Sequence, residues 1–172
     1  YVSIVISNTS YKSVVDVFDK TGNEIFKTNL VTSRVADVSI SQDSKYLAIA
    51  EIDLSGILIK SSIQVVSIEL AKTNPSQAII NKYEAPTDKM ILNVEYQEQN
   101  KLICMYSDEI EVYEEKTSTE LIKFDDKKES FMTIELSNRV ALVDEISTGE
   151  YTANTNIRII DPNTKKEREY VT

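Results

Sequence analysis

The sequence predicts an all-β protein made of repeated sheets, and three observations support this fold class. Helical periodicity is nearly missing: the best candidate, residues 68–80, is interrupted by Asn74-Pro75, and proline inside a helix costs about 3 kcal/mol. Apolar residues come instead in short alternating or continuous runs rich in Val, Ile and Tyr, which is typical of β-strands. The third observation is an internal repeat.

The repeat is a five-residue pattern, apolar-polar-apolar-apolar-polar, that occurs four times. Its start-to-start spacings are 48, 47 and 47 residues, and such even spacing indicates a repeated structural unit. The four copies occupy residues 15–19, 63–67, 110–114 and 157–161.

Each copy predicts a strand that is followed by a turn and a second strand. Gly22-Asn23 and Asp161-Pro162-Asn163 are residues that suit tight turns. The strands after the turns are predicted at 25–30, 78–83, 121–124 and 167–171.

Each of the last three copies is also preceded by a predicted hairpin. The hairpins pair residues 35–40 with 46–50, 91–96 with 102–106, and 131–136 with 140–143. Only one strand, residues 2–6, precedes the first copy. The repeating unit is therefore four antiparallel strands within about 47 residues.

A four-stranded sheet repeated at this spacing predicts the blades of a β-propeller. Such a sheet is apolar on both faces and buries them only by stacking against neighbouring sheets around an axis. The second strand at 102–106 is apolar throughout, whereas Lys82, Lys123 and Glu169 suit outer edge strands. We expect one domain over residues 1–172. It comprises a partial blade at 1–31 and blades at 35–84, 90–125 and 131–172.

The predicted strands make an incomplete ring of about three and three-quarter blades, whereas closed propellers have about 4 to 8. Three interpretations remain open: a fragment of a longer ring, a compact four-bladed ring with one incomplete blade, or two copies that complete one ring. Because an open end exposes apolar faces and a bare sheet edge, we expect self-association through the terminal blades.

The stretch from Ser41 to Ala50, Ser-Gln-Asp-Ser-Lys-Tyr-Leu-Ala-Ile-Ala, resembles the common blade motif of bacterial propellers. Over most of its length the chain is similar to the WD-repeat-like, often membrane-anchored propeller proteins of Gram-positive bacteria. It lacks Trp, and with it the closing dipeptide of WD repeats. The resemblance implies the fold and a location on the extracytoplasmic face of a bacterial membrane, with the cytoplasm as the alternative. It brings no functional residues.

Composition argues against several classes of function. With 19 basic and 28 acidic residues the net charge is −9, which disfavours binding to nucleic acid and to anionic membrane surfaces. No apolar run approaches the roughly 18 residues of a membrane span, so we expect no direct membrane insertion by this segment. The chain has no His, which argues against His-based catalysis and against zinc sites built on His. It has a single Cys, which argues against a zinc site built on several Cys, and only three Gly, which argues against a glycine-rich phosphate loop. We expect no cofactor and no metal ligand, and Cys104 to be a buried structural thiol.

Carboxylates are the remaining candidates for catalysis. Glycosidases place two carboxylates across a cleft, but neighbours such as Asp125 and Asp126 point to opposite faces of a strand. Asp16 is replaced in the sister repeats by Gln64, Glu111 and Arg158, which predicts a tolerant solvent position. We therefore expect no catalytic residue. The alternatives are a propeller enzyme acting on glycans by carboxylate catalysis, with its active site partly outside this chain, and a carboxylate-lined channel that holds a cation.

The function we expect is a non-enzymatic interaction or scaffold module that presents one loop face to a protein or peptide. Loops on a rigid scaffold commonly carry function, and the predicted loops are long and unequal. Residues 54–59 are rich in aliphatic side chains and form either an exposed patch or a strand extension. The candidate partner-binding residues are Leu54, Ile57, Leu58, Asp88, Asp125, Asp126 and Tyr151.

Overall fold

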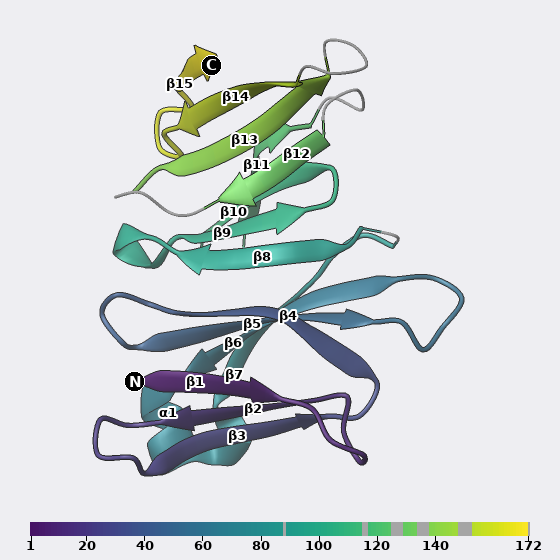
Figure 1. The fold of residues 1–172 in the computed structure, drawn as a ribbon. Helices are drawn as coiled ribbons and strands as arrows, with labels where there is room; N and C mark the ends of the chain where they lie inside the picture. Colours follow the sequence, from purple (N-terminus) through teal and green to yellow (C-terminus); the bar gives the residue numbers. More distant parts are fainter. Residues whose placement is uncertain (88, 115–116, 125–128, 134–137, 148–152, 172) are drawn as a thin grey trace. The chain divides into compact units, whose positions relative to one another are not determined.

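The computed structural model describes residues 1–87, 89–114, 117–124, 129–133, 138–147 and 153–171 (Figure 1). Over these residues the chain forms fifteen strands, one short α-helix and two 3-10 turns. The strands lie in four antiparallel sheets, and strands that follow one another along the chain are neighbours in their sheet. The predicted all-β class is confirmed.

Residues Tyr1–Ser107 form one compact unit. Its first sheet has the order β1-β2-β3 and its second sheet the order β4-β5-β6-β7, followed by the hairpin of β8 and β9. The bounds are β1 Val2–Ile6, β2 Ser13–Phe18, β3 Glu24–Leu30, β4 Ser33–Ile40, β5 Tyr46–Asp53, β6 Lys60–Ser67, β7 Ile79–Glu84, β8 Ile91–Tyr96 and β9 Leu102–Tyr106.

Residues Asp108–Thr172 form the second compact unit. Its strands β10 and β11 belong to the third sheet, whose order is β11-β10-β9-β8 and which also contains the β8–β9 hairpin. The fourth sheet has the order β12-β13-β14-β15. The bounds are β10 Glu109–Glu114, β11 Thr117–Lys123, β12 Glu129–Thr133, β13 Val140–Ser147, β14 Ala153–Ile160 and β15 Glu167–Val171.

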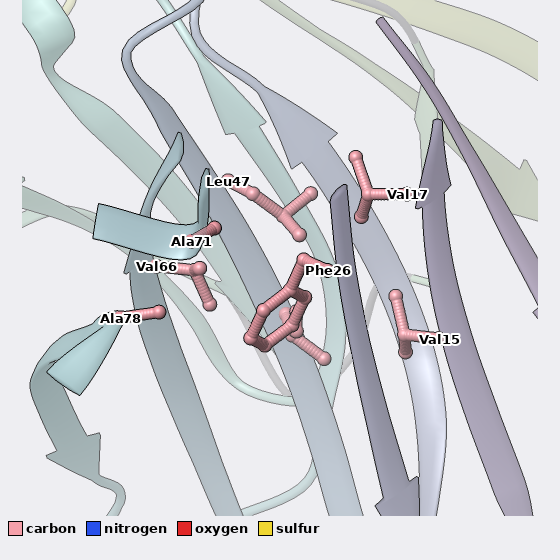
Figure 2. Packing of buried hydrophobic residues seen from close by; sticks show 8 residues of the cluster. Val15, Val17, Phe26, Leu47, Val66, Ala71 and Ala78 are labelled. Carbon is pink, nitrogen blue, oxygen red and sulfur yellow. The ribbon is translucent and has the colours of Figure 1, made fainter. Parts of the chain in front are cut away.

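The core of the first unit lies between the first and second sheets (Figure 2). Val15 and Val17 of β2 and Phe26 of β3 contribute from the first sheet. Leu47 of β5 and Val66 of β6 contribute from the second. Both sheets supply apolar side chains at alternate positions, so each buries one apolar face against the other.

Strands β5 and β9, the second strands of the second and third sheets, carry buried side chains on both faces, as predicted. In β5, Leu47, Ala48, Ile49 and Ala50 have no exposed surface, although successive side chains point to opposite sides of the sheet. Strand β9 is buried at all five positions and includes Cys104, as expected for a structural thiol. A continuous apolar run in these strands therefore reflects a sheet that is covered on both sides.

Helix α1, Ile68–Thr73, is absent from the prediction, which assigned no helix to this region. The Ser67 hydroxyl caps it by accepting a hydrogen bond from the Leu70 N–H at 3.3 Å. The helix ends before Pro75, so the proline limits its length without preventing it. Its buried residues Ile68 and Ala71 face the core, and α1 packs against β3 (Figure 1). No helix in the described ranges is long and apolar enough to cross a bilayer.

Two serines join neighbouring sheets at equivalent places in the repeat. The buried Ser13 hydroxyl at the start of β2 accepts a hydrogen bond from the Val35 N–H of β4 at 3.0 Å. Forty-eight residues later, the buried Ser61 hydroxyl of β6 accepts one from the Ile91 N–H of β8 at 3.1 Å. Val35 and Ile91 each lie at a bulge in the pairing of their strand. A bulge interrupts the hydrogen bonds of the strand pair, so the backbone amide there can donate to a side chain of the neighbouring sheet.

Candidate functional site

Among the described loops, the loop between β5 and β6 exposes the most large aliphatic side chains. Strand β5 ends at Asp53 and β6 begins at Lys60, so residues 54–59 are a loop and the predicted alternative of a strand extension is wrong. Leu54, Ile57 and Leu58 are exposed in this loop, and Ile57 is fully exposed. Exposed aliphatic side chains grouped in one loop are unusual in a soluble domain unless a partner covers them.

Asp53 fixes the base of this loop. One carboxylate oxygen accepts a hydrogen bond from the Ser55 N–H at 2.8 Å, and the other accepts one from the Thr32 hydroxyl at 2.9 Å. The hydrogen bond from the Ser55 side chain, followed by those from its backbone and from Thr32, holds the pKa of Asp53 below its usual value. Asp53 is therefore charged at neutral pH and ties the link between β3 and β4 to the loop.

That link adds a fourth aliphatic residue to the surface. Val31 precedes Thr32 and is exposed, and Leu54 follows Asp53, so the hydrogen-bonded pair brings both residues to the same end of the second sheet. We call Val31, Leu54, Ile57 and Leu58 the apolar loop patch. Three of these residues are among the candidates predicted from the sequence and Val31 is not, although the link at residues 31–34 is expected to share a face with this loop. The hydrogen bond that joins Thr32 to Asp53, 21 positions apart, cannot be read from local periodicity.

Basic residues adjoin the apolar loop patch. Lys60 stands opposite Asp53 in the β5–β6 register, and Arg34 stands opposite Ile52 in the β4–β5 register. The Lys12 N–H donates to the Leu30 carbonyl at 2.9 Å, next to Val31. All three basic side chains are exposed. Three basic residues and the Asp53 carboxylate opposite Lys60 thus adjoin the patch, on a chain whose net charge is −9.

A second polar cluster lies between β4 and β8 in the first unit. One Asp37 carboxylate oxygen accepts hydrogen bonds from the Asn93 amide at 2.6 Å and from the Val94 N–H at 3.1 Å. Burial raises the pKa of Asp37, and the backbone hydrogen bonds oppose that rise. The buried Ser39 hydroxyl accepts a hydrogen bond from the Tyr96 N–H at 2.9 Å. These contacts fasten two strands that are not neighbours in a sheet.

The other well-placed carboxylates of the first unit are also engaged by basic or neutral donors. Asp16 is buried and lies 2.8 Å from the Lys27 ammonium, so the prediction of a tolerant solvent position is wrong. The buried Glu51 accepts hydrogen bonds from Ser62 at 2.9 Å and from Gln64 at 2.7 Å. A repeat position whose residue type varies can therefore still be buried in one repeat, where a partner on the neighbouring strand, here Lys27, compensates the charge.

Turn carboxylates are likewise used locally. Asp19 accepts hydrogen bonds from Thr21 and from the Asn23 N–H, and the Thr21 side chain is the main cause of its lowered pKa. Asp43 accepts one from the Ser41 hydroxyl at 2.8 Å, which is the main contribution that lowers its pKa to about 2. Across the described positions, no group of three or more acidic, Cys or His residues is arranged to hold a metal ion.

Four of the seven candidate residues cannot be placed. Asp88, Asp125, Asp126 and Tyr151 lie outside the described residues. The remaining three, Leu54, Ile57 and Leu58, come together in one loop.

The chain belongs to a family of unknown function, DUF5711, whose model matches residues 1–170. A search of curated proteins finds no significant match to it. Among solved structures, the crystal structure of cobalt-substituted Synechocystis ACO is similar, with a TM-score of 0.41 and 7% sequence identity. The match covers 98% of this chain and 46% of that one, so the chain spans less than half the length of that protein.

Proposed function

We propose that this chain is a non-enzymatic interaction module whose apolar loop patch binds a protein or peptide partner. The observation that carries the proposal is the exposure of Leu54, Ile57 and Leu58 in a single loop whose base is fixed by Asp53. A fixed loop loses little conformational entropy on binding, and aliphatic side chains gain by leaving water.

The rim of the patch indicates the chemistry of the partner. Lys12, Arg34 and Lys60 are exposed beside the aliphatic centre. Interfaces commonly combine an apolar centre with a polar rim of complementary charge, and rim charges mainly set the association rate and the specificity. The partner we propose is an apolar segment flanked by acidic residues.

A glycan-acting enzyme is supported less well by the described residues. Such an enzyme needs two carboxylates facing one bond. Asp16, Asp37 and Glu51 instead engage lysine, amide, hydroxyl or backbone donors.

Peptide display on the chain, followed by titration of the selected peptides, tests the interaction module. We expect the selected sequences to combine aliphatic and acidic residues. We expect Ile57→Asp to weaken their binding at least tenfold, or about 1.4 kcal/mol, because it places a charge at the centre of the contact. Circular dichroism should show an unchanged fold, since Ile57 is fully exposed.

Ile80→Asp is the matched control, because Ile80 is an exposed isoleucine on β7, away from the apolar loop patch. It should leave the affinity unchanged. Selection of no peptide, equal loss in both variants, or binding to anionic lipid vesicles in place of peptides would contradict the proposal.

The four sheets are also proposed to be successive blades of a β-propeller. The even repeat spacing, the four-stranded sheets and the serine joints between successive sheets in residues 1–107 support this arrangement. In an experimental structure, strands β4, β8 and β12 should surround one axis. Two sheets packed as a sandwich would contradict it.

An extracytoplasmic location is proposed from the resemblance to membrane-anchored propellers. Protease treatment of intact cells tests this, since an exposed chain would be digested and a cytoplasmic one protected.

A further inference from the structure

The apolar loop patch is built from two separate segments of the chain. Three of its aliphatic residues lie in the loop between β5 and β6, and Val31 lies in the link between β3 and β4. The last residue pair of the β4–β5 ladder at this end is Ser33 with Asp53, so both segments leave the sheet directly beyond it. From there on, the backbone ladder no longer holds the two segments together.

A single carboxylate continues the connection beyond the ladder. The Thr32 hydroxyl donates to one Asp53 oxygen at 2.9 Å, and the Ser55 N–H donates to the other at 2.8 Å. Each donor directly follows an aliphatic residue of the patch, Val31 in the link and Leu54 in the loop. Among the described residues, no other side-chain hydrogen bond joins the link to the loop.

The corresponding loops of the neighbouring sheets are held differently. In the third sheet, the loop between β9 and β10 has only two residues. In the first sheet, the Asn8 side chain accepts hydrogen bonds from the N–H groups of Ser10 and Tyr11, both at 2.9 Å, within its own loop. The hydrogen bond from Thr32 to Asp53 instead couples a loop to a second segment.

This coupling matters because both segments expose aliphatic surface. Val31 is 64% exposed and Leu54 is 58% exposed. A partner that covers both residues must meet them in one arrangement, and segments that move independently would have to be ordered on binding. The hydrogen bond from Thr32 orders them before the partner arrives.

We propose that Thr32 is a positioning residue for partner binding: its hydroxyl holds Val31 beside the β5–β6 loop, so that the partner meets both segments as one preformed surface. The inference rests on the proposed function of the apolar loop patch. Because Thr32 acts through Asp53, an aliphatic side chain cannot replace it. A residue that only contacted the partner would bind it equally well or better as an aliphatic residue.

Thr32→Val tests this difference, since it exchanges the hydroxyl for a methyl group of similar size. The probes are the peptides selected by display on the unsubstituted chain. We expect the Kd to rise by about three- to tenfold, because the apparent affinity falls with the fraction of molecules whose segments are correctly placed. Thr32→Ser keeps the hydroxyl and should bind the peptides as the unsubstituted chain does.

Thr21→Val is the matched control. The Thr21 hydroxyl also donates to a carboxylate, that of Asp19 at 2.6 Å, but in the turn between β2 and β3. This turn lies at the opposite end of the first sheet from Leu30, the residue before Val31. The substitution should leave the Kd unchanged.

The free chain provides a second measurement that needs no partner. After the side chain and backbone of Ser55, the Thr32 hydroxyl is the next group that holds the pKa of Asp53 below its usual value. In Thr32→Val, nuclear magnetic resonance should therefore show a higher pKa of Asp53 and faster hydrogen exchange of the Ser55 amide. Thr32→Ser should leave both unchanged.

Unchanged or tighter peptide binding by Thr32→Val, while Ile57→Asp still weakens it, would overturn the positioning role and leave the interaction module standing. Equal weakening by Thr32→Val and Thr21→Val, weakened binding by Thr32→Ser, or an unchanged Asp53 pKa in Thr32→Val would overturn it too. If no peptide binds the unsubstituted chain, the proposed function fails and this inference fails with it.

Discussion

Two serines of this protein complete hydrogen bonds that the sheets leave open. Ser13 and Ser61 accept the amides at the bulges of β4 and β8. Both stand two residues before the repeated pattern, where the later repeats carry Asp108 and Thr155. All four residues bear a side-chain oxygen. The sequence holds this regularity, but only the structure shows that the oxygens of Ser13 and Ser61 join one sheet to the next.

Asp43 is expected to make stability depend on pH in the acid range. Hydrogen bonds led by the Ser41 hydroxyl lower its pKa to about 2, below the roughly 3.9 of an unfolded chain. A depressed folded pKa gives stability that is complete above the unfolded value and is lost as the pH falls through the folded value. The Tm difference between the unsubstituted chain and Asp43→Asn should therefore be largest near pH 6 and shrink between about pH 4 and 2.

Asp37→Asn provides the comparison of opposite sign. Burial raises the pKa of Asp37, so its ionisation costs stability as the pH rises through the raised value. Relative to the unsubstituted chain, the Tm of Asp37→Asn should increase as the pH rises, and the Tm of Asp43→Asn should increase as the pH falls. Parallel Tm profiles for the two variants would contradict the assignment.

At the scale of elements, burial on both faces explains why β5 is apolar at successive positions. Leu47 near its start is fully buried in the core against the first sheet (Figure 2). Leu54 follows directly after its end and is exposed. One residue type therefore occupies two opposite environments at the two ends of a single strand.

Leu47→Ala should lower the free energy of unfolding by about 2–5 kcal/mol, because it removes a buried side chain and leaves a cavity. Leu54→Ala should change it by less than about 0.5 kcal/mol, because the exposed side chain gains little from folding. Urea unfolding of both variants measures the contrast. Similar midpoints would show that the second sheet does not bury Leu47 against the first.

At the scale of the whole molecule, the strands could be predicted because their periodicity is local. The predicted ranges of β1, β8, β9 and β15 coincide with the observed ones. Helix α1 could not be predicted in this way, because six residues are fewer than two turns and show no period. Composition alone pointed to Leu54, Ile57 and Leu58. It could not show the contacts that hold the loops and strands around them, because the hydrogen bonds from Thr32 to Asp53 and from Asn93 to Asp37 join residues that are distant in the sequence.

Net charge and exposed apolar surface have opposite effects on the association of copies of this chain. At neutral pH a charge of −9 keeps copies apart, while the apolar loop patch and β1 offer aliphatic surface for contact. The repulsion vanishes near the isoelectric point of about 4.6. The average mass from light scattering should therefore rise as the pH falls from about 7.5 towards that point, and added salt at pH 7.5 should raise it by screening. A mass that stays constant over both changes would show that charge is not what limits association.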